Sequence, residues 1–183
     1  KDSVELMLKG NRKPPANPLS LMLAYKYNNR ISPTGWWLSE KYNGIRAYWD
    51  GKQLVSRNYL PLQVPQDILN TFPAVPLDGE IWFGYGGLSE AMKVSHKAPG
   101  VQWDKFRFMV FDCPSHGGLF EDRLAHLQTL IPADHPYLKL VQFVQCTGRS
   151  HLQEFFDAVL KKKGEGVMLR APHSVYHPGR SQS

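Results

Sequence analysis

The stretch SEKYNGIRAYWDGK, residues Ser39–Lys52, places a lysine between two runs that are typical of β-strands. The Asp50-Gly51 step after the second run is a strong signal for a tight hairpin. Three strands are therefore predicted in and around this stretch, at Trp36–Lys41, Ile45–Trp49 and Gln53–Arg57.

Lys41 is the first candidate for chemistry. The free pKa of a lysine amine is about 10.4, so the amine is a poor nucleophile until burial or nearby cations lower that pKa. Gly44 would let a phosphate approach the backbone closely, and Arg46 adds a positive charge near such a phosphate. On this stretch alone, an ordinary solvent-exposed lysine at a strand end is the simpler interpretation.

The composition indicates one globular domain, alone or with a short appendage. The 183 residues are 42% hydrophobic and 21% charged, and no run approaches the roughly 18 apolar residues of a membrane span. The formal net charge of +6 favours a polyanionic partner such as nucleic acid. Cys113 and Cys146 have neither a disulfide framework nor a zinc-binding spacing. The chain starts at Lys1 rather than methionine and shows no apolar signal region, so a leader could have been removed and the compartment stays open.

The remaining segments predict an α+β domain rather than a regular βαβ alternation. Residues 1–18 contain three prolines and are predicted to be an extended arm, with the domain itself over 19–183. A short buried helix is predicted at Leu19–Tyr27, and longer helices at Glu121–Ile131 and His151–Lys163, the last with a capping box from Ser150 and Gln153 and a stop at Gly164. Further strands are predicted at Val75–Phe83, Phe106–Asp112, Lys139–Gln145 and Gly166–Arg170.

Acidic residues occur at the ends of three predicted strands. They lie in the segments LDGEIW (77–82), FMVFD (108–112) and EGVMLR (165–170). Together with a lysine and arginines, such carboxylates could hold a nucleotide and its divalent cation while the lysine attacks a phosphorus. Taken singly, each is more often a solvated turn residue.

In this order the segments resemble the covalent nucleotidyltransferases, the superfamily of ATP-dependent DNA ligases, RNA ligases and mRNA capping enzymes. KYNGIR (41–46) resembles the nucleotidyl-lysine motif KxDGxR, and SRN (56–58), DGEIW, FMVFD and EGVMLR resemble the motifs that follow it. The resemblance covers about residues 19–181. Within the superfamily, these segments are most similar to small ATP-dependent DNA ligases with a minimal core. It implies an ATP-grasp-like α+β nucleotidyltransferase fold of mainly antiparallel sheets flanked by helices.

The resemblance also implies roles for individual residues. Lys41 would carry AMP, with Asn43 and Arg46 beside it in the catalytic motif. Arg46 and Arg57 would contact ribose or phosphate. Phe111 would stack on adenine, although a strand phenylalanine is a core residue by default.

Further residues would complete the ligand site. Glu80 would bind the ribose, and Glu165 and Glu80 would hold Mg²⁺. Arg123 and Arg180 would make secondary phosphate or DNA contacts. The implied reaction runs from ATP to lysyl-AMP, then to an adenylated 5′-phosphate at a nick in double-stranded DNA, and then to a sealed strand in repair or replication, carried out by a monomer without a membrane partner.

Two departures from the family pattern bear on activity. Asn43 stands where the motif has aspartate, which removes a carboxylate beside Lys41. The chain ends at Gly179–Ser183, before the lysine-bearing strand and the OB-fold domain that follow in such ligases, so these residues alone are expected to be impaired. An RNA ligase or capping-type nucleotidyltransferase, and a non-catalytic nucleotide- or nucleic-acid-binding domain, are the alternatives.

Overall fold

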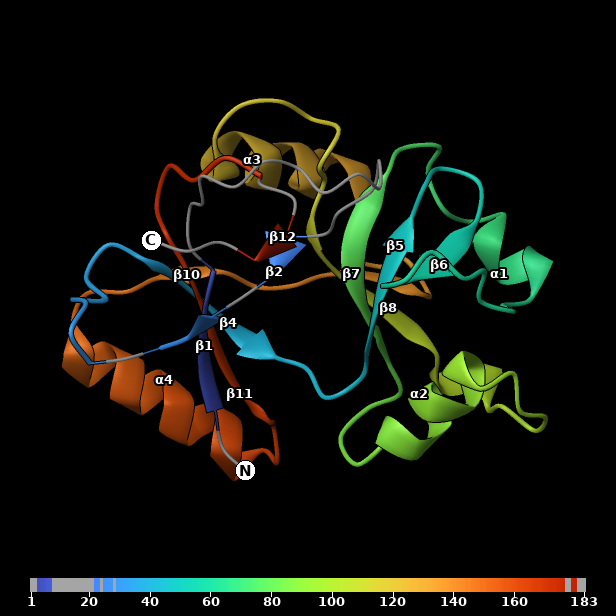
Figure 1. Ribbon diagram of the computed structural model, residues 1–183, viewed down its shortest axis with the longest axis horizontal. Helices are drawn as coiled ribbons and strands as arrows, with labels where there is room; N and C mark the ends of the chain where they lie inside the picture. The colour runs from blue at the N-terminus through green and yellow to red at the C-terminus, as the bar shows by residue number, and fades with distance from the viewer. Residues whose placement is uncertain (1–2, 8–21, 24, 28, 177–178, 181–183) are drawn as a thin grey trace. The chain divides into compact units, whose positions relative to one another are not determined.

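The computed structural model describes residues 3–7, 22–23, 25–27, 29–176 and 179–180 (Figure 1). The chain divides into two units, each with its own sheet. The first comprises Lys1–Tyr42, Gly118–Glu121 and Gln142–Ser183, and the second comprises Asn43–Gly117 and Asp122–Val141. In the described part of the chain, every helix is too short or too polar to cross a membrane.

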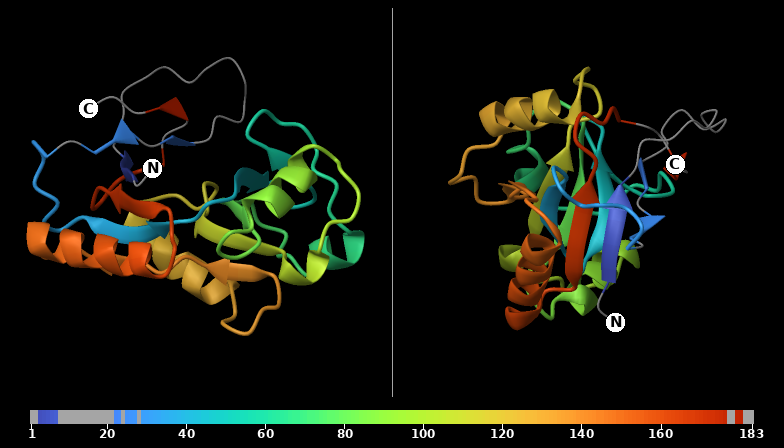
Figure 2. Two further views of the ribbon diagram at one scale, coloured as in Figure 1. Left: turned by 90° about the horizontal axis from the view of Figure 1, so that it is seen from below. Right: turned by 90° about the vertical axis from the view of Figure 1, so that its left-hand side faces the viewer.

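The first unit contains a five-stranded sheet in the order β10-β4-β11-β1-β3. Helix α4 lies along this sheet (Figures 1 and 2), and its apolar side chains pack with those of β4 and β11 around Leu38, Val167 and Leu169. The elements of this unit are β1 (Ser3–Met7), β2 (Met22–Leu23), β3 (Tyr25–Lys26), β4 (Trp37–Lys41), β10 (Val144–Gln145), α4 (Arg149–Lys161), β11 (Gly166–Arg170) and β12 (Gly179–Arg180). Strands β12 and β2 form a separate two-stranded pair.

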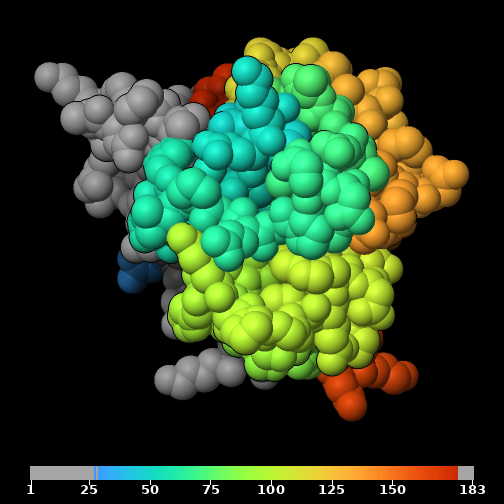
Figure 3. Space-filling view, turned by 90° about the vertical axis from the view of Figure 1, so that its right-hand side faces the viewer, coloured from blue at the N-terminus to red at the C-terminus, as the bar shows by residue number. Residues whose placement is uncertain are grey.

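The second unit contains a five-stranded sheet in the order β6-β5-β7-β8-β9, covered on one face by apolar residues from its helices. Figure 3 views a face of this unit on which the segment of α2, in yellow-green, lies beside the segment of α1, in green. The elements of this unit are β5 (Ile45–Trp49), β6 (Leu54–Ser56), α1 (Gln66–Leu69), β7 (Leu77–Trp82), α2 (Leu88–Ser95), the 3₁₀ helix η1 (Trp103–Lys105), β8 (Arg107–Asp112) and β9 (Leu138–Leu140). Helix α3 (Phe120–Leu130) begins in the first unit and continues in the second.

The predicted α+β class is confirmed, and antiparallel pairs predominate in both large sheets. The described parallel pairs are β1–β11, β8–β9 and β12–β2. The predicted hairpin is present between β5 and β6, where Gly51 has φ +101° and the Asp50 carboxylate accepts hydrogen bonds from the N–H groups of Lys52 and Gln53. The predicted long strands and the helix at Glu121–Ile131 also form, within one or two residues at each end.

Three predictions of secondary structure are wrong. The helix at Leu19–Tyr27 is replaced in its described residues by the short strands β2 and β3; a continuous apolar run such as that at 21–25 fits either a buried helix or a buried strand. The N-terminal arm contains β1, which is hydrogen-bonded between β11 and β3, while its residues 8–18 lie outside the described part. The single strand at Lys139–Gln145 is two strands, β9 and β10, in different sheets.

The ends of α4 also differ from the prediction. The helix starts at Arg149 after Gly148, without a side-chain cap, so Ser150 lies inside the first turn and the predicted capping box is absent from α4.

At the other end of α4, Lys163 takes the left-handed conformation with φ +66°. The N–H of Gly164 binds the carbonyl of Val159, and the N–H of Lys163 binds the carbonyl of Leu160, which is a Schellman motif. Gly164 is needed because a Cβ there would lie 2.5 Å from Val159 Cγ1.

Candidate functional site

Lys41 is the last residue of β4, and Glu165 directly precedes the neighbouring strand β11. The two strands are antiparallel, with Lys41 opposite Gly166, so the side chains of Lys41 and Glu165 start from adjacent positions. The Nζ atom of Lys41 lies 3.4 Å from Oε1 of Glu165, and the two side chains are 22% and 28% exposed. A partly exposed ion pair of this kind contributes little to stability but leaves both groups within reach of a ligand.

A second ion pair lies beside the first. Glu40 is buried, and its Oε1 atom lies 2.9 Å from Nζ of Lys162. Successive strand residues point to opposite faces, so Glu40 and Lys41 leave β4 on different sides. Lys162 and Glu165 both belong to the short connection between α4 and β11, which therefore binds two consecutive residues of β4.

In the second unit, the sheet turns one face toward its apolar core and carries polar and aromatic residues on the other. Residues of the core face include Ala47, Ile81 and Val110. Strand alternation sends their neighbours to the opposite face. We call this opposite face the charged face; its residues are Arg46, Tyr48, Asp78, Glu80 and Phe111.

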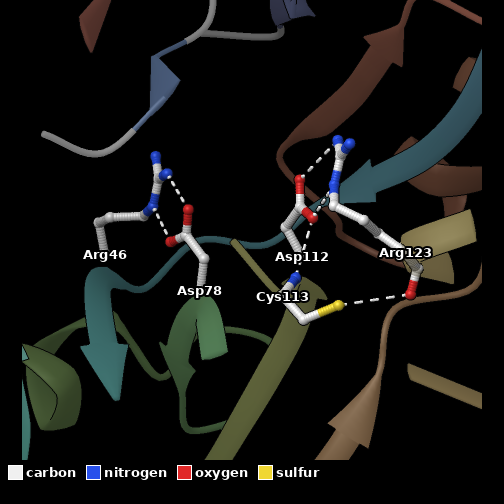
Figure 4. Close-up of polar contacts among 5 residues, drawn as sticks. All are labelled: Arg46, Asp78, Asp112, Cys113 and Arg123. Carbon is white, nitrogen blue, oxygen red and sulfur yellow. Dashed lines mark hydrogen bonds and ion pairs between the residues drawn. The ribbon is translucent and has the colours of Figure 1, made fainter. Parts of the chain in front are cut away.

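Arg46 is the centre of the charged face. It lies directly opposite Glu80 in the β5–β7 ladder. Its Nε and Nη2 atoms donate hydrogen bonds of 2.7 Å each to the two oxygens of Asp78, which is fully buried (Figure 4). Its guanidinium carbon lies 4.8 Å from the centre of the Phe111 ring, a cation–π distance. The structure thus brings together three predicted site residues, Arg46, Glu80 and Phe111.

A second arginine–aspartate pair lies in the same unit and was missed by sequence reasoning. Arg123 Nε lies 2.7 Å from Asp112 Oδ1, and the two side chains are 1% and 0% exposed. Asp112 also accepts a hydrogen bond from the backbone N–H of Cys113 (Figure 4). The predicted role of Arg123 as a phosphate or DNA contact is wrong, because its guanidinium is buried against this carboxylate.

The thiol of Cys113 is enclosed by the same pair. It donates to the carbonyl of Arg123 at 3.4 Å. Burial, together with the negative charge of Asp112, raises the pKa of the Cys113 thiol to about 12, although Arg123 opposes this shift. The thiol therefore stays protonated near neutral pH and acts as a packing group.

Two motif glycines are required by close strand packing. A Cβ at Gly44 would meet the carbonyl oxygen of Ile81, and one at Gly79 would lie 2.5 Å from the carbonyl oxygen of Met109. At Gly44 the space of a side chain is taken by β7, and the approach of a phosphate to the Gly44 backbone stays a prediction. Gly79 lies at an irregularity in the β7–β8 register.

The other predicted site residues lie in different surroundings. Asn43 is exposed in the bend between β4 and β5, and Arg57 is exposed in the turn that follows β6. Arg180 lies in β12 opposite Leu23, and its side chain is outside the described part of the structure.

Arg170, the last residue of β11, is a second buried arginine. It is 2% exposed, and its guanidinium carbon lies 4.4 Å from the centre of the Phe120 ring. Neither its burial nor that of Arg123 has a local sequence signal, because both depend on tertiary packing.

Carboxylates are the candidate metal ligands. Over the described residues, no group of three or more His, Cys, Asp or Glu side chains could enclose a metal ion. Mg²⁺ rarely uses such a cage and is usually held by one or two carboxylates plus phosphate oxygens of a substrate. Glu80 and Glu165 have the donor chemistry for that mode.

Comparison with known proteins decides the family. The family model described as ATP dependent DNA ligase domain matches residues 21–183. The chain belongs to this family. The curated DNA ligase of Haemophilus influenzae is 36% identical over 164 residues, which are 88% of this chain and 60% of that ligase. The chain thus spans about 60% of the length of this relative.

Solved structures of ligases share the fold of this ligase domain. A Lig E DNA ligase, described as binding DNA with a minimal scaffold, is 33% identical with a TM-score of 0.78, covering 89% of this chain and 66% of that one. The Chlorella virus DNA ligase–adenylate has 20% identity and a TM-score of 0.72, covering 100% of this chain and 65% of that one, and shows the fold alone. The predicted family and nucleotidyltransferase fold are confirmed.

Proposed function

We propose that this ligase domain is the adenylation domain of an ATP-dependent DNA ligase and that Lys41 carries the AMP. The observation that carries the proposal is the charged face, where Arg46 lies opposite Glu80 and over Phe111, on the strand that follows Lys41. In the reaction, the Lys41 amine forms a bond to the α-phosphorus of ATP. The bond to pyrophosphate breaks, and the amine proton passes to solvent.

Each residue of the charged face would bind a different part of the nucleotide. Glu80 can accept hydrogen bonds from ribose hydroxyls, and Arg46 can donate hydrogen bonds to ribose or phosphate oxygens. The Phe111 ring is partly exposed and already carries one planar group, so it suits stacking with adenine. Exposed Arg57 would contact phosphate or ribose, and Arg180 would make an outer phosphate contact.

Mg²⁺ would be held by Glu165 and Glu80 together with phosphate oxygens. When bound, Mg²⁺ neutralises the charge that accumulates on the phosphate oxygens. Glu165 also has a role toward Lys41, because at 3.4 Å it stabilises the ammonium form of the lysine. Lys41 must lose a proton before it attacks, so a ligand that draws Glu165 away favours the reactive amine.

Asn43 is the motif residue that departs from the family pattern beside Lys41, and it should affect the rate at which Lys41 attacks. An aspartate in this position would accept hydrogen bonds through two charged oxygens, whereas Asn43 offers one neutral acceptor and two donors. Asn43 is exposed in the bend between β4 and β5, so it can be replaced by aspartate without disturbing the core.

The later steps belong to a complete ligase acting on nicked double-stranded DNA. AMP would pass from Lys41 to the 5′-phosphate of the nick, and attack by the 3′-hydroxyl would then release AMP. The net charge of +6 suits a phosphate-rich partner. Because the chain spans about 60% of its curated relative, sealing by a monomer is proposed for an extended protein, in which the chain is lengthened to the span of that relative.

The test incubates the protein with Mg²⁺ and ATP labelled at the α-phosphate, then measures covalent label on the denatured chain. We expect label on the natural chain or its Asn43→Asp variant, and none on Lys41→Ala. No label on an extended Asn43→Asp protein would overturn the proposal and favour the non-catalytic alternative. Stronger labelling by GTP would favour a capping-type enzyme, and preference for nicked RNA over nicked DNA would favour an RNA ligase.

A further inference from the structure

Two buried aspartates face each other across the central strands of the second unit. Asp78 on β7 and Asp112 on β8 are partners in the ladder, and both are 0% exposed. Like charges directly opposite each other on a sheet are destabilising, and burial increases the repulsion. A pair of carboxylates in this position therefore needs compensation from cations.

Each aspartate is bound by an arginine, so the two carboxylates lie between the two guanidinium groups (Figure 4). Arg46 binds Asp78 through two hydrogen bonds of 2.7 Å, and Arg123 binds Asp112 through contacts of 2.7 and 3.3 Å. The two arginines differ in access to solvent, since the Arg46 side chain is 16% exposed and that of Arg123 is 1% exposed. Arg46 is thus the arginine that a ligand can reach.

We propose that Arg123 is a positioning residue for Arg46. By neutralising Asp112, it leaves Asp78 as the carboxylate that binds Arg46, and so holds the Arg46 guanidinium over Phe111. The guanidinium has five donors and binds carboxylates in a fork, so the loss of Arg123 would draw it from Asp78 toward Asp112. Such a shift would move Arg46 away from Phe111 and from the ligand position on the charged face.

The same reasoning applies to the other half of the pair. Replacing Asp112 by asparagine leaves the Arg123 guanidinium without its carboxylate, and Arg123 then competes with Arg46 for Asp78. Each single substitution should therefore disturb Arg46, whereas removing both charges together should restore it. This reciprocal pattern is the signature of a positioning pair and does not follow from a general loss of stability.

The first experiment observes Arg46 directly and needs no ligand. Solvent exchange of its Nε–H is followed by ¹⁵N NMR of arginine side chains, with the signal assigned by Arg46→Lys. In the unaltered chain this N–H should exchange slowly, because it is bound to a buried carboxylate. Arg123→Met and Asp112→Asn should each speed its exchange at least tenfold, and the double substitution Arg123→Met/Asp112→Asn should return it toward the original rate.

The matched control is Leu127→Ala, one turn further along α3 and fully buried in the same unit. It should lower stability while leaving the Arg46 exchange rate unchanged, when both are measured at a temperature where circular dichroism shows folded protein. If Arg123→Met does not fold, the Arg46 exchange rates in Asp112→Asn and in the double variant still test whether Arg123 positions Arg46. Slow Arg46 exchange in every folded single variant would overturn the proposal.

The second experiment measures ATP affinity by calorimetry and rests on the proposed function, in which Arg46 contacts the nucleotide. Each single variant should bind ATP about tenfold or more weakly, the loss expected for one charge-assisted hydrogen bond, and the double variant should recover the affinity. Failure of the unaltered chain and of its extended form to bind ATP would refute the proposed function, while the exchange measurement would still decide the role of Arg123. Unchanged affinity in the single variants would show that Arg123 has only a structural role.

Discussion

The Arg46–Asp78 pair is expected to be among the most important polar contacts for stability, and Asp78→Asn tests this. The substitution keeps the side-chain volume and one acceptor oxygen but removes the charge. It weakens two hydrogen bonds of 2.7 Å, and the partner arginine is only 16% exposed. One lost charge-assisted hydrogen bond costs about 1.5–3 kcal/mol, and breaking a buried pair costs about 3–5 kcal/mol.

We therefore expect Asp78→Asn to lower the free energy of unfolding by about 3 kcal/mol, equivalent to a fall in Tm of roughly 6–12 °C for a chain of this size. The assay is urea denaturation followed by tryptophan fluorescence and by circular dichroism. Asp134→Asn is the control, because Asp134 is exposed and the change should stay within about 0.5 kcal/mol. A loss below about 1 kcal/mol for Asp78→Asn would refute the reasoning, since solvent would then screen this pair as it screens surface pairs.

Three further predictions follow from single contacts. Gly44→Ala should destabilise the fold by about 1–3 kcal/mol in urea denaturation, because the new methyl group meets the Ile81 carbonyl. Gly117→Ala should have little effect, because the space around Gly117 is open. Equal losses of stability in the two variants would contradict this account. The Cys113 thiol, whose pKa is raised to about 12 by burial first and by Asp112 second, should resist thiol reagents at pH 8 until the protein unfolds; rapid labelling of this cysteine in the folded chain would be inconsistent with its burial. Burial alone would raise the pKa of Glu121, but hydrogen bonds from the Trp37 indole and the His173 backbone N–H outweigh burial and hold this pKa below its usual value. The Glu121 carboxylate therefore stabilises the fold fully above the unfolded pKa near 4.5, and this stabilisation is lost as pH falls through the lower folded pKa. Urea midpoints between about pH 2.5 and 6 should fall less steeply with acid in Glu121→Gln, and parallel curves would show that Glu121 is not responsible.

Local patterns in the sequence predicted most of the central strands. Alternation over Ile45–Trp49 and the Asp50-Gly51 step specify a hairpin without help from the rest of the chain. At Leu19–Tyr27 the same rule does not decide, because the apolar run at 21–25 is continuous and fits either a helix or a strand. The pairing of β1 with β11 could not be predicted, because it joins residues about 160 positions apart and has no turn signal between them.

The sequence predicted the candidate site residues that lie in recognisable motifs, but not the residues whose surroundings depend on burial. Arg46, Glu80 and Phe111 were found from their order in the chain, and strand alternation then placed them on one face. Asp112 and Arg123 were misjudged because a charged residue is expected at the surface until its partner is known. The burial of a charge depends on packing between elements, which a local pattern does not record.

The most direct test of the central claim is to locate AMP on the chain by peptide mapping. After incubation with ATP and Mg²⁺, trypsin should not cleave at a modified Lys41, so AMP should be found on a single peptide that runs from Ile31 to Arg46. The extended Asn43→Asp protein should give this peptide in higher yield, and Lys41→Ala should give none. AMP on another lysine, or no AMP on any peptide of the extended Asn43→Asp protein, would contradict the assignment of Lys41 as the nucleophile.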